Sequence, residues 1–275
     1  MEFLQPPGWR EALEARAAHP DALPIWGGTD VMVELNFART RPAALLDLTH
    51  VPELSRWESE DGGVRIGAGV TYTRLIAELG DRLPGLAMAS RTVGSPQIRN
   101  RGTIGGNLGS SSPAGDALPP LYAAGASVEV ASVRGARRIP IDEFIVGPKR
   151  NVLGEDELIA GVFVPVRDDA AQQFAKVGTR NAMVIAVCSF AVDVSEGRVG
   201  TCIGSAGPTP IRAREAEAFA ASAAPEDAAA REFGELVAAA ASPIDDVRGT
   251  AAYRRHALSV LARRTITWAW ETRCA

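Results

Sequence analysis

The sequence predicts a two-domain α+β protein whose character changes near residue 168. Before that point, short strand-like and helical runs are intermixed. After it come three runs richer in Val, Ile and Phe, at residues 172–177, 184–194 and 199–205, and Gly197 marks a tight turn between the last two. Helical runs follow at 213–221, 226–241 and about 250–273. Sequential strands joined by short turns predict an antiparallel sheet, which these helices would cover as a small second domain.

Short elements fill the first domain. Trp9, Leu13 and Ala17 share one face of a helix predicted over residues 9–18. Further strands are expected at 45–48, 64–66, 127–131, 137–141 and 158–164, and further helices at 71–79, 85–91 and 118–124.

A stretch rich in glycine and serine lies at the centre of the first domain, at residues 95–116. It reads SPQIRNRGTIGGNLGSSSPAGD, and its glycines would let the main chain approach a ligand closely. Successive backbone amides with small hydroxyls form anion-binding concavities, and Arg99 and Arg101 add positive potential. Ile98, Ile104 and Leu108 are apolar residues that a solvated linker would not need. We therefore expect an ordered loop that holds a phosphate-bearing ligand, rather than a flexible surface loop.

A second glycine turn occurs earlier, in PIWGGTDV. Ile25 and Trp26 suit a short buried strand, Gly27 and Gly28 make a turn, and Thr29 or Asp30 can cap a helix over residues 31–35. A glycine turn that leads into a helix is a common phosphate site. Two such segments predict a ligand with two phosphates, or a long, bent ligand that both segments contact.

The run IGAGVTYTRL offers an alternative nucleotide site. A strand leads into Gly67 and Gly69 and then into a helix, as in a Rossmann fingerprint, but Tyr72 stands where the third glycine belongs. No strand ending in Asp follows about 20 residues later. A tight structural turn is the better interpretation.

Composition argues against several classes of protein. The 275 residues carry a formal net charge of −4, and no basic stripe indicates a nucleic-acid partner. No apolar run approaches the roughly 20 residues of a membrane span, and the N-terminus lacks the pattern of a secretory signal, so we expect a cytoplasmic protein. The cysteines and histidines are scattered, so we expect no metal centre in this chain, with the first two cysteines in the core. These residues are Cys188, Cys202, Cys274, His19, His50 and His256.

The final predicted helix carries an apolar stripe and two pairs of arginines. The stripe consists of Leu258, Leu261, Thr265 and Trp268 at 3.5-residue spacing. The arginines are Arg254, Arg255, Arg263 and Arg264. They lie off the stripe, and a solvated face is their simplest interpretation.

Five motifs occur in the order typical of a known family: PIWGGTD, VGSPQIRNRGTIGGNL, PAGD, KVGTR and YRRHALSVLARR. Together they resemble the flavin-binding medium subunit of the molybdenum hydroxylases, a family that includes xanthine dehydrogenases and aerobic carbon monoxide dehydrogenases. The resemblance covers nearly the whole chain. It implies a two-lobed FAD-binding domain of the p-cresol methylhydroxylase type over residues 1–168 and a small C-terminal domain over residues 169–275.

The resemblance also implies which residues bind FAD. Two glycine loops lie against the diphosphate in this family, and the matching positions are Ile25, Trp26, Gly27, Gly28, Thr29, Asp30 and Val31, with Thr103, Ile104, Gly105, Gly106 and Asn107. Asp116 matches an acid at the adenosine end, Ile159 an aliphatic residue near the flavin, and Lys176 a lysine that approaches the cofactor. The stretch 181–184 departs from the family, which often has Asp there, and this weakens inference about that edge of the flavin site.

Function follows from the same resemblance. No Ser-His-Asp set, nucleophilic cysteine or carboxylate pair stands out, so we expect no catalytic residue beyond those that hold the flavin. The family hydroxylates its substrate at a molybdenum cofactor on a large subunit and passes electrons through [2Fe-2S] clusters of a small subunit to FAD. NAD⁺ is the expected electron acceptor, with oxygen and a quinone as alternatives. The substrate stays open and could be a purine, another N-heterocycle, an aldehyde or carbon monoxide. The stoichiometry of the complex also stays open. The alternatives are a self-sufficient flavin oxidoreductase of the same fold and a cofactor-free scaffold subunit.

Overall fold

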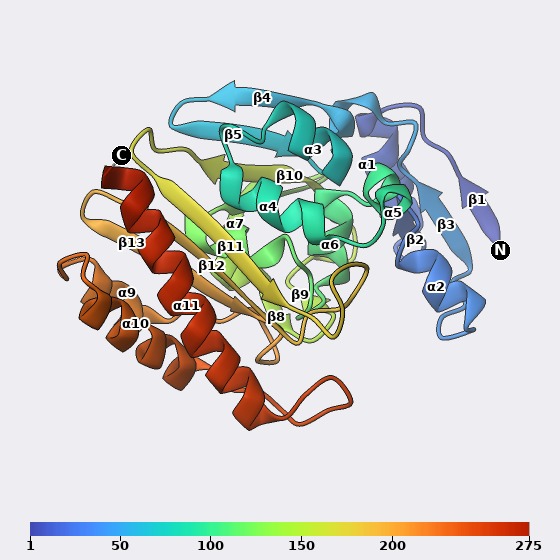
Figure 1. Cartoon of the computed structure of the whole chain (residues 1–275). Helices are drawn as coiled ribbons and strands as arrows, with labels where there is room; N and C mark the ends of the chain where they lie inside the picture. Colours follow the sequence, from blue (N-terminus) through green and yellow to red (C-terminus); the bar gives the residue numbers. More distant parts are fainter. Residues whose placement is uncertain (275) are drawn as a thin grey trace.

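The computed structural model describes residues 1–274 and contains two main sheets, one before and one after residue 168 (Figure 1). The first is antiparallel, has five strands in the order β4-β5-β10-β6-β7, and forms one lobe of the first domain. Its strands are β4 (Trp57–Glu60), β5 (Gly63–Gly67), β6 (Ser127–Ser132), β7 (Gly135–Pro140) and β10 (Leu158–Pro165). The inner strands β5, β6 and β10 supply buried Val, Ile and Leu side chains to the core.

A small parallel sheet forms the other lobe. Its strands are β1 (Glu2–Leu4), β3 (Ala44–Asp47) and β2 (Leu23–Ile25), in that order. All four residues of β3 are buried because both neighbours pair with it. The lobe also contains α1 (Trp9–Ala18), α2 (Val31–Asn36) and a 3₁₀ turn (Pro52–Ser55). The two predicted lobes and the α+β class are confirmed, although β1 and β4 were not predicted.

Helices and a short hairpin connect the strands. They are α3 (Tyr72–Glu78), α4 (Pro84–Thr92), α5 (Pro96–Arg101), α6 (Ile104–Ser110), α7 (Leu118–Ala124), α8 (Ile141–Phe144), β8 (Ile145–Gly147) and β9 (Arg150–Asn151). The interpretation of residues 95–116 as a loop was therefore wrong in form, because α5 and α6 lie within it. Ser95 and Thr103 cap these two helices, and Ile104 and Leu108 are fully buried one turn apart. Capping and burial outweigh the poor helix propensity of the glycines.

The C-terminal domain contains the predicted three-stranded antiparallel sheet, of β11 (Ala171–Val177), β12 (Cys188–Ser195) and β13 (Arg198–Gly204). Three helices complete it: α9 (Arg214–Ala220), α10 (Asp227–Ala240) and α11 (Ala251–Cys274). Strand β12 begins at Cys188 and not at residue 184 as predicted, because Met183 and Ile185 are exposed in the connection before it. Cys188 and Cys202 are buried in the core, as predicted.

The central strand β12 is buried on both faces. Cys188, Phe190 and Val192 point toward the helices, and Phe190 meets Phe233 of α10 edge to face at 6.1 Å between ring centres. The intervening residues point the other way, toward α4 and α7 of the first domain, where Ala191 packs with Ala123. Successive strand residues face opposite sides. The sheet is therefore covered by α10 and α11 on one face and by α4 and α7 of the first domain on the other (Figure 1).

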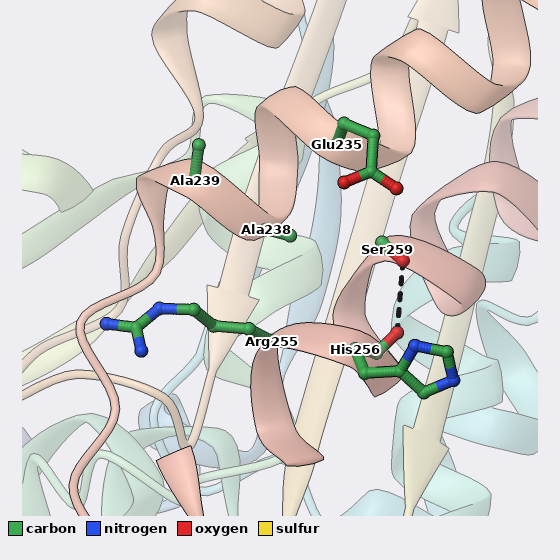
Figure 2. A pocket seen from close by; sticks show the side chains of 6 residues that line it. All are labelled: Glu235, Ala238, Ala239, Arg255, His256 and Ser259. Carbon is green, nitrogen blue, oxygen red and sulfur yellow. Dashed lines mark hydrogen bonds between the residues drawn. The ribbon is translucent and has the colours of Figure 1, made fainter. Parts of the chain in front are cut away.

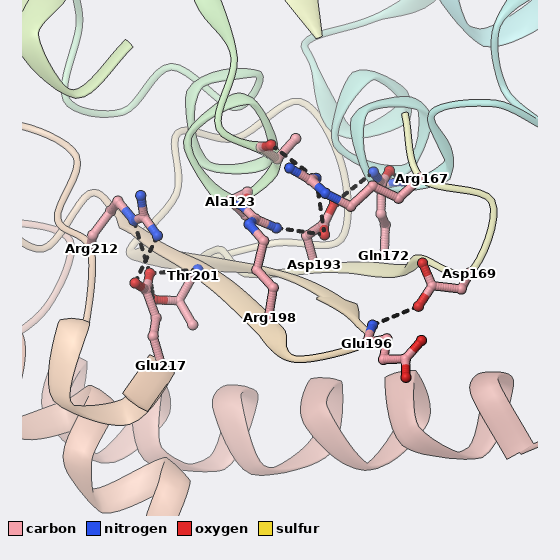
Figure 3. A network of polar contacts seen from close by, with 12 residues as sticks. Ala123, Arg167, Asp169, Gln172, Asp193, Glu196, Arg198, Thr201, Arg212 and Glu217 are labelled. Carbon is pink, nitrogen blue, oxygen red and sulfur yellow. Dashed lines mark hydrogen bonds and ion pairs between the residues drawn. The ribbon is translucent and has the colours of Figure 1, made fainter. Parts of the chain in front are cut away.

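A buried carboxylate lies in the second of these interfaces (Figure 3). Asp193 accepts hydrogen bonds from Arg198 and Gln172, both at 2.9 Å. Burial raises the pKa of Asp193, and Arg198 opposes that rise. Arg198 also donates to the Ala123 carbonyl at 2.7 Å, and Arg167 donates to that of Ala124. The cluster therefore links the C-terminal sheet to the last carbonyls of α7.

The last helix, α11, differs from its prediction at two positions. Arg254 was assigned to a solvated face, yet it is only 4% exposed and donates to the Ser205 carbonyl and to Asp246, at 2.7 and 2.5 Å. Trp268 was placed on the apolar stripe, yet it is 45% exposed. The buried residue is Ala269, because about three turns of a 3.6-residue helix bring this position back over Leu258.

We expect R254Q to lower the free energy of unfolding by about 1–3 kcal/mol, because it leaves buried polar partners unsatisfied. R255Q is the matched control: Arg255 is exposed, and its loss should change stability little. The pKa of Asp246 is held down at about 2 by bonds from Arg248 and Arg254. The ionised carboxylate therefore stabilises the fold above its ordinary pKa, and this contribution is lost as the pH falls toward 2. Urea unfolding should show the difference between wild type and R254Q shrinking on acidification.

Candidate functional site

The two glycine segments singled out in the sequence lie against each other. A Cβ atom at Gly27 would sit 2.0 Å from the Arg101 carbonyl oxygen, so only glycine fits there. The ring of Trp26 lies over Gly69, where an added Cβ would come within 2.6 Å of the indole. The structure thus brings residues 25–31 together with the α5–α6 junction, about 75 residues later in the chain.

The glycines of the Rossmann-like run are used for packing. A Cβ at Gly67 would lie 2.3 Å from the Leu54 carbonyl oxygen, and Gly69 lies under Trp26. Strand β5 pairs antiparallel with β4 and β10, whereas a Rossmann fold needs parallel βαβ units. The structural interpretation of this turn is confirmed.

The first glycine loop offers a run of free backbone amides. Within residues 1–274, the amides of Gly27, Gly28, Thr29, Asp30 and Val31 donate to no other residue. Gly28 adopts φ +73°, a left-handed conformation that glycine tolerates. Asp30 is the N-cap of α2, but its side chain makes none of the capping bonds that were expected. Successive unpaired amides at a tight turn form a concavity suited to an anion.

The amides of the second glycine segment are already engaged. Those of Ile104 and Gly105 donate to the carbonyls of Val70 and Ala68, at 3.2 and 2.9 Å, and that of Gly106 donates to the Thr103 hydroxyl at 3.0 Å. This segment therefore cannot offer those amides to a phosphate without breaking internal bonds. Its contribution is shape: Gly106 and Gly109 are exposed three residues apart on α6 and leave the helix surface bare.

Ile159 lies beside that bare surface. It is on β10, next to a bulge at Ala160, and is 9% exposed. A Cβ at Gly109 would make ordinary contact with its terminal methyl, at 3.7 Å. An apolar group and an uncovered helix face are thus adjacent, as a flat aromatic ligand would require.

Two buried acceptor atoms belong to Asn107, which contacts Gly115, and to Asp116, the next residue in the chain. The side-chain oxygen of Asn107 and Oδ1 of Asp116 have no hydrogen-bond partner among the described residues. The amide of Asn107 is so close to Gly115 that an added Cβ would lie 2.6 Å from it. Buried polar atoms without partners are rare in folded proteins, so these two acceptors indicate a place for ligand donors.

Lys176 holds the other oxygen of Asp116. Its Nζ lies 2.6 Å from Oδ2 of Asp116 and 3.3 Å from the Thr92 carbonyl oxygen. Burial raises the pKa of Asp116, and the charge of Lys176 opposes that rise. Lys176 is thus a buried member of an ion pair between the two domains.

Tyr72 is a site neighbour that the sequence did not reveal as such. Its ring lies 3.3 Å from where a Cβ of Gly102 would be, and its amide donates to the Gly102 carbonyl. Burial, and then the charges of Asp116 and Asp30, raise the pKa of its hydroxyl, which stays protonated as a donor. The available signal was its place after the Gly67 turn, where a nucleotide fingerprint would have glycine.

A second link across the site was also missed. Lys149, on the β8–β9 hairpin, places Nζ 2.8 Å from Glu34 of α2, and its amide donates to the Ser111 carbonyl. The pair joins segments 115 residues apart, a separation from which no local pattern predicts contact.

A groove outside these segments lies between α10 and α11 (Figure 2). It measures about 310 Å³ and is lined by Glu235, Ala238, Ala239, Arg255, His256 and Ser259. It holds no glycine turn, and the side chains of Glu235 and Arg255 do not converge on a common point (Figure 2). Over residues 1–274, no three His, Cys, Asp or Glu side chains come together as a metal site, and no helix is long and apolar enough to cross a membrane.

Comparison with known proteins identifies the family. Residues 1–167 match the FAD binding domain in molybdopterin dehydrogenase, and residues 173–269 match the CO dehydrogenase flavoprotein C-terminal domain. The chain therefore belongs to the family of FAD-binding medium subunits of the molybdenum hydroxylases, and the predicted resemblance is confirmed.

Relatives of known activity match over most of their length. The chain is 31% identical to the nicotine 6-hydroxylase medium subunit of Paenarthrobacter nicotinovorans, over 97% of this chain and 96% of that protein. It is 30% identical to the xanthine dehydrogenase FAD-binding subunit of Escherichia coli O157:H7, over 94% and 91%. A chain of Hydrogenophaga pseudoflava carbon monoxide dehydrogenase superposes with a TM-score of 0.93 at 29% identity, covering 100% of this chain and 98% of that one. These relatives are oxidoreductase subunits, as was expected of this chain.

We expect G27A and G109A to have opposite effects on stability in the absence of ligand. G27A forces the Arg101 carbonyl away and should cost about 1–3 kcal/mol, the usual cost of overpacking. G109A places a methyl group at an exposed helix position and should be neutral or gain up to about 1 kcal/mol. Thermal unfolding measures the stability of both variants. If G27A were as stable as G109A, the first glycine loop could move away from α5 without loss of stability, and the close contact at Gly27 would not matter.

Proposed function

We propose that this chain binds FAD and acts as the electron-transfer subunit of a heteromeric molybdenum hydroxylase. The observation that carries the proposal is the run of five free backbone amides at residues 27–31, which suits the FAD diphosphate. FAD would supply the redox chemistry, so the residues of the chain need only bind it, orient it and control access to it.

The other residues fit the rest of the cofactor. The bare face of α6 at Gly106 and Gly109, together with Ile159, suits the flat flavin. The Thr103 hydroxyl and the Asn107 side chain supply polar contacts from the second glycine segment, and Ile25 and Trp26 support the first. Oδ1 of Asp116 is free to accept from a ribose hydroxyl at the adenosine end.

The partners in this proposal follow from the relatives. Several are named as the medium subunit or chain of a larger enzyme, and one as a subunit of a dehydrogenase complex. We propose a large subunit with a molybdenum cofactor, a small subunit with [2Fe-2S] clusters, and NAD⁺ as electron acceptor.

The proposal includes a domain boundary at residue 168, between β10 and β11. It also includes a cytoplasmic location, where free thiols such as the three in this chain stay reduced.

Two alternatives are weaker. A self-sufficient flavin oxidoreductase needs a substrate pocket with a convergent acid or base, and among the described residues the glycine segments hold no such pair beside Ile159. A cofactor-free scaffold would have no use for a run of unpaired amides, which cost free energy when they are left without water or ligand.

We expect the purified chain to bind FAD, as measured by the visible absorption of oxidised flavin and by quenching of its fluorescence. G109A should bind FAD about 10-fold or more weakly, because its methyl group occupies the face where the flavin would lie. A228S on exposed α10 is the control and should bind like wild type. A folded wild-type chain that takes up no FAD, even when it is produced with both partner subunits, would refute the proposed function.

A further inference from the structure

We propose that Lys176 is a positioning residue for Asp116: it orients the carboxylate so that Oδ1 accepts from the ribose at the adenosine end of FAD. The C-terminal domain would thereby complete the binding site of the first domain. This inference rests on the proposed function and deepens it, since it assigns Lys176 to the ribose end through Asp116 rather than to direct contact with the flavin.

The geometry of the pair is the first support. Lys176 reaches Oδ2 of Asp116 at 2.6 Å, and the two side chains are 7% and 10% exposed. The ammonium has three donors, and a second one lies 3.3 Å from the Thr92 carbonyl oxygen at the end of α4. Two bonds from different directions fix the ammonium, and the ammonium in turn fixes the rotation of the carboxylate.

The free oxygen is the second support. Oδ1 of Asp116 is buried and has no partner among the described residues, and so is the side-chain oxygen of Asn107, which contacts Gly115. A ribose presents hydroxyl donors, one of which would supply the hydrogen bond that Oδ1 lacks. The two oxygens of the Asp116 carboxylate therefore have different roles: Oδ2 accepts from Lys176, and Oδ1 is left for the ligand.

The surroundings of Asp116 explain why it needs Lys176. The titratable groups that face it are Lys176 from β11 and Tyr72 from α3, while α4 contributes the uncharged Thr92. Tyr72 is neutral, so Lys176 is the counter-charge in this buried place. Without it, only the Thr92 side chain would oppose the effect of burial, which favours the protonated carboxyl, a poorer acceptor.

The support of α7 points to the same conclusion. Asp116 lies two residues before α7, whose last carbonyls are held by Arg198 and Arg167. The C-terminal domain thus contacts both ends of this helix, through Lys176 before its first turn and Arg198 at its last. The position of Asp116 is consequently set by contacts with the second domain.

The test is FAD titration of the full chain by fluorescence quenching, from about pH 6 to about pH 9, the range in which a buried carboxyl without a partner titrates. Wild type and K176R should bind FAD with little pH dependence, because both keep a cation on Oδ2. K176M should bind about 10- to 100-fold more weakly at the acid end and recover as the pH rises and Asp116 loses its proton. D116N should bind weakly at every pH. The absorption spectrum of the bound flavin should be the same in K176M and wild type.

Other outcomes would overturn the inference. A K176M variant whose affinity is independent of pH, and whose flavin absorption shifts, would place the lysine against the flavin instead. Wild type that binds no FAD would refute the proposed function itself, which distinguishes the two failures. If circular dichroism shows K176M unfolded, the K176Q/D116N double variant keeps a neutral hydrogen bond, and it should bind FAD weakly without pH dependence. Tight binding by that variant would also contradict the inference.

Discussion

The backbone of Gly27 packs directly against the carbonyl of Arg101. A Cβ atom at residue 27 would lie 2.0 Å from that carbonyl oxygen, so no side chain fits there. This contact joins the parallel lobe to α5, which lies in the chain between β5 and β6 of the five-stranded sheet. The turn at Gly27 and Gly28 then leaves five amides unpaired, because the chain follows neither a strand nor a regular helix there. The free amides, the bare surface of α6 and the site as a whole depend on that approach.

The second constraint is the double burial of β12. Because alternate residues of a strand face opposite sides, its apolar set packs on α10 and α11 while Asp193 is turned toward α7. A carboxylate buried in this way needs partners, and Arg198 supplies one that also holds the end of α7. The same sheet carries Lys176 on its edge strand β11, which brings a cation to the buried Asp116. The C-terminal domain therefore contacts the candidate site directly.

The sequence predicted the elements with strong periodicity and missed those that tertiary contacts stabilise. Helices α1 and α7 have the predicted bounds, since their apolar spacing or prolines mark them locally. Helices α5 and α6 were taken for loop because glycine and serine are poor helix formers, and only the burial of Ile104 and Leu108 compensates. Arg254 was placed in solvent because its bonds are to Asp246 and to Ser205, which is 49 residues away.

What the sequence alone determined is the family, the α+β class and the three-stranded C-terminal sheet, and it singled out the two glycine segments of the candidate site. These depend on local motifs, periodicity and glycine placement, all of which can be read along the chain. Only the tertiary structure decided which amides are free. Within residues 1–274, those of the first glycine loop have no acceptor, whereas those of the second glycine segment donate to Val70, Ala68 and Thr103. The tertiary structure alone paired Asp116 with Lys176, 60 residues later. Hydrogen-bond partners and burial depend on which distant segments meet, and that is a property of the packed fold.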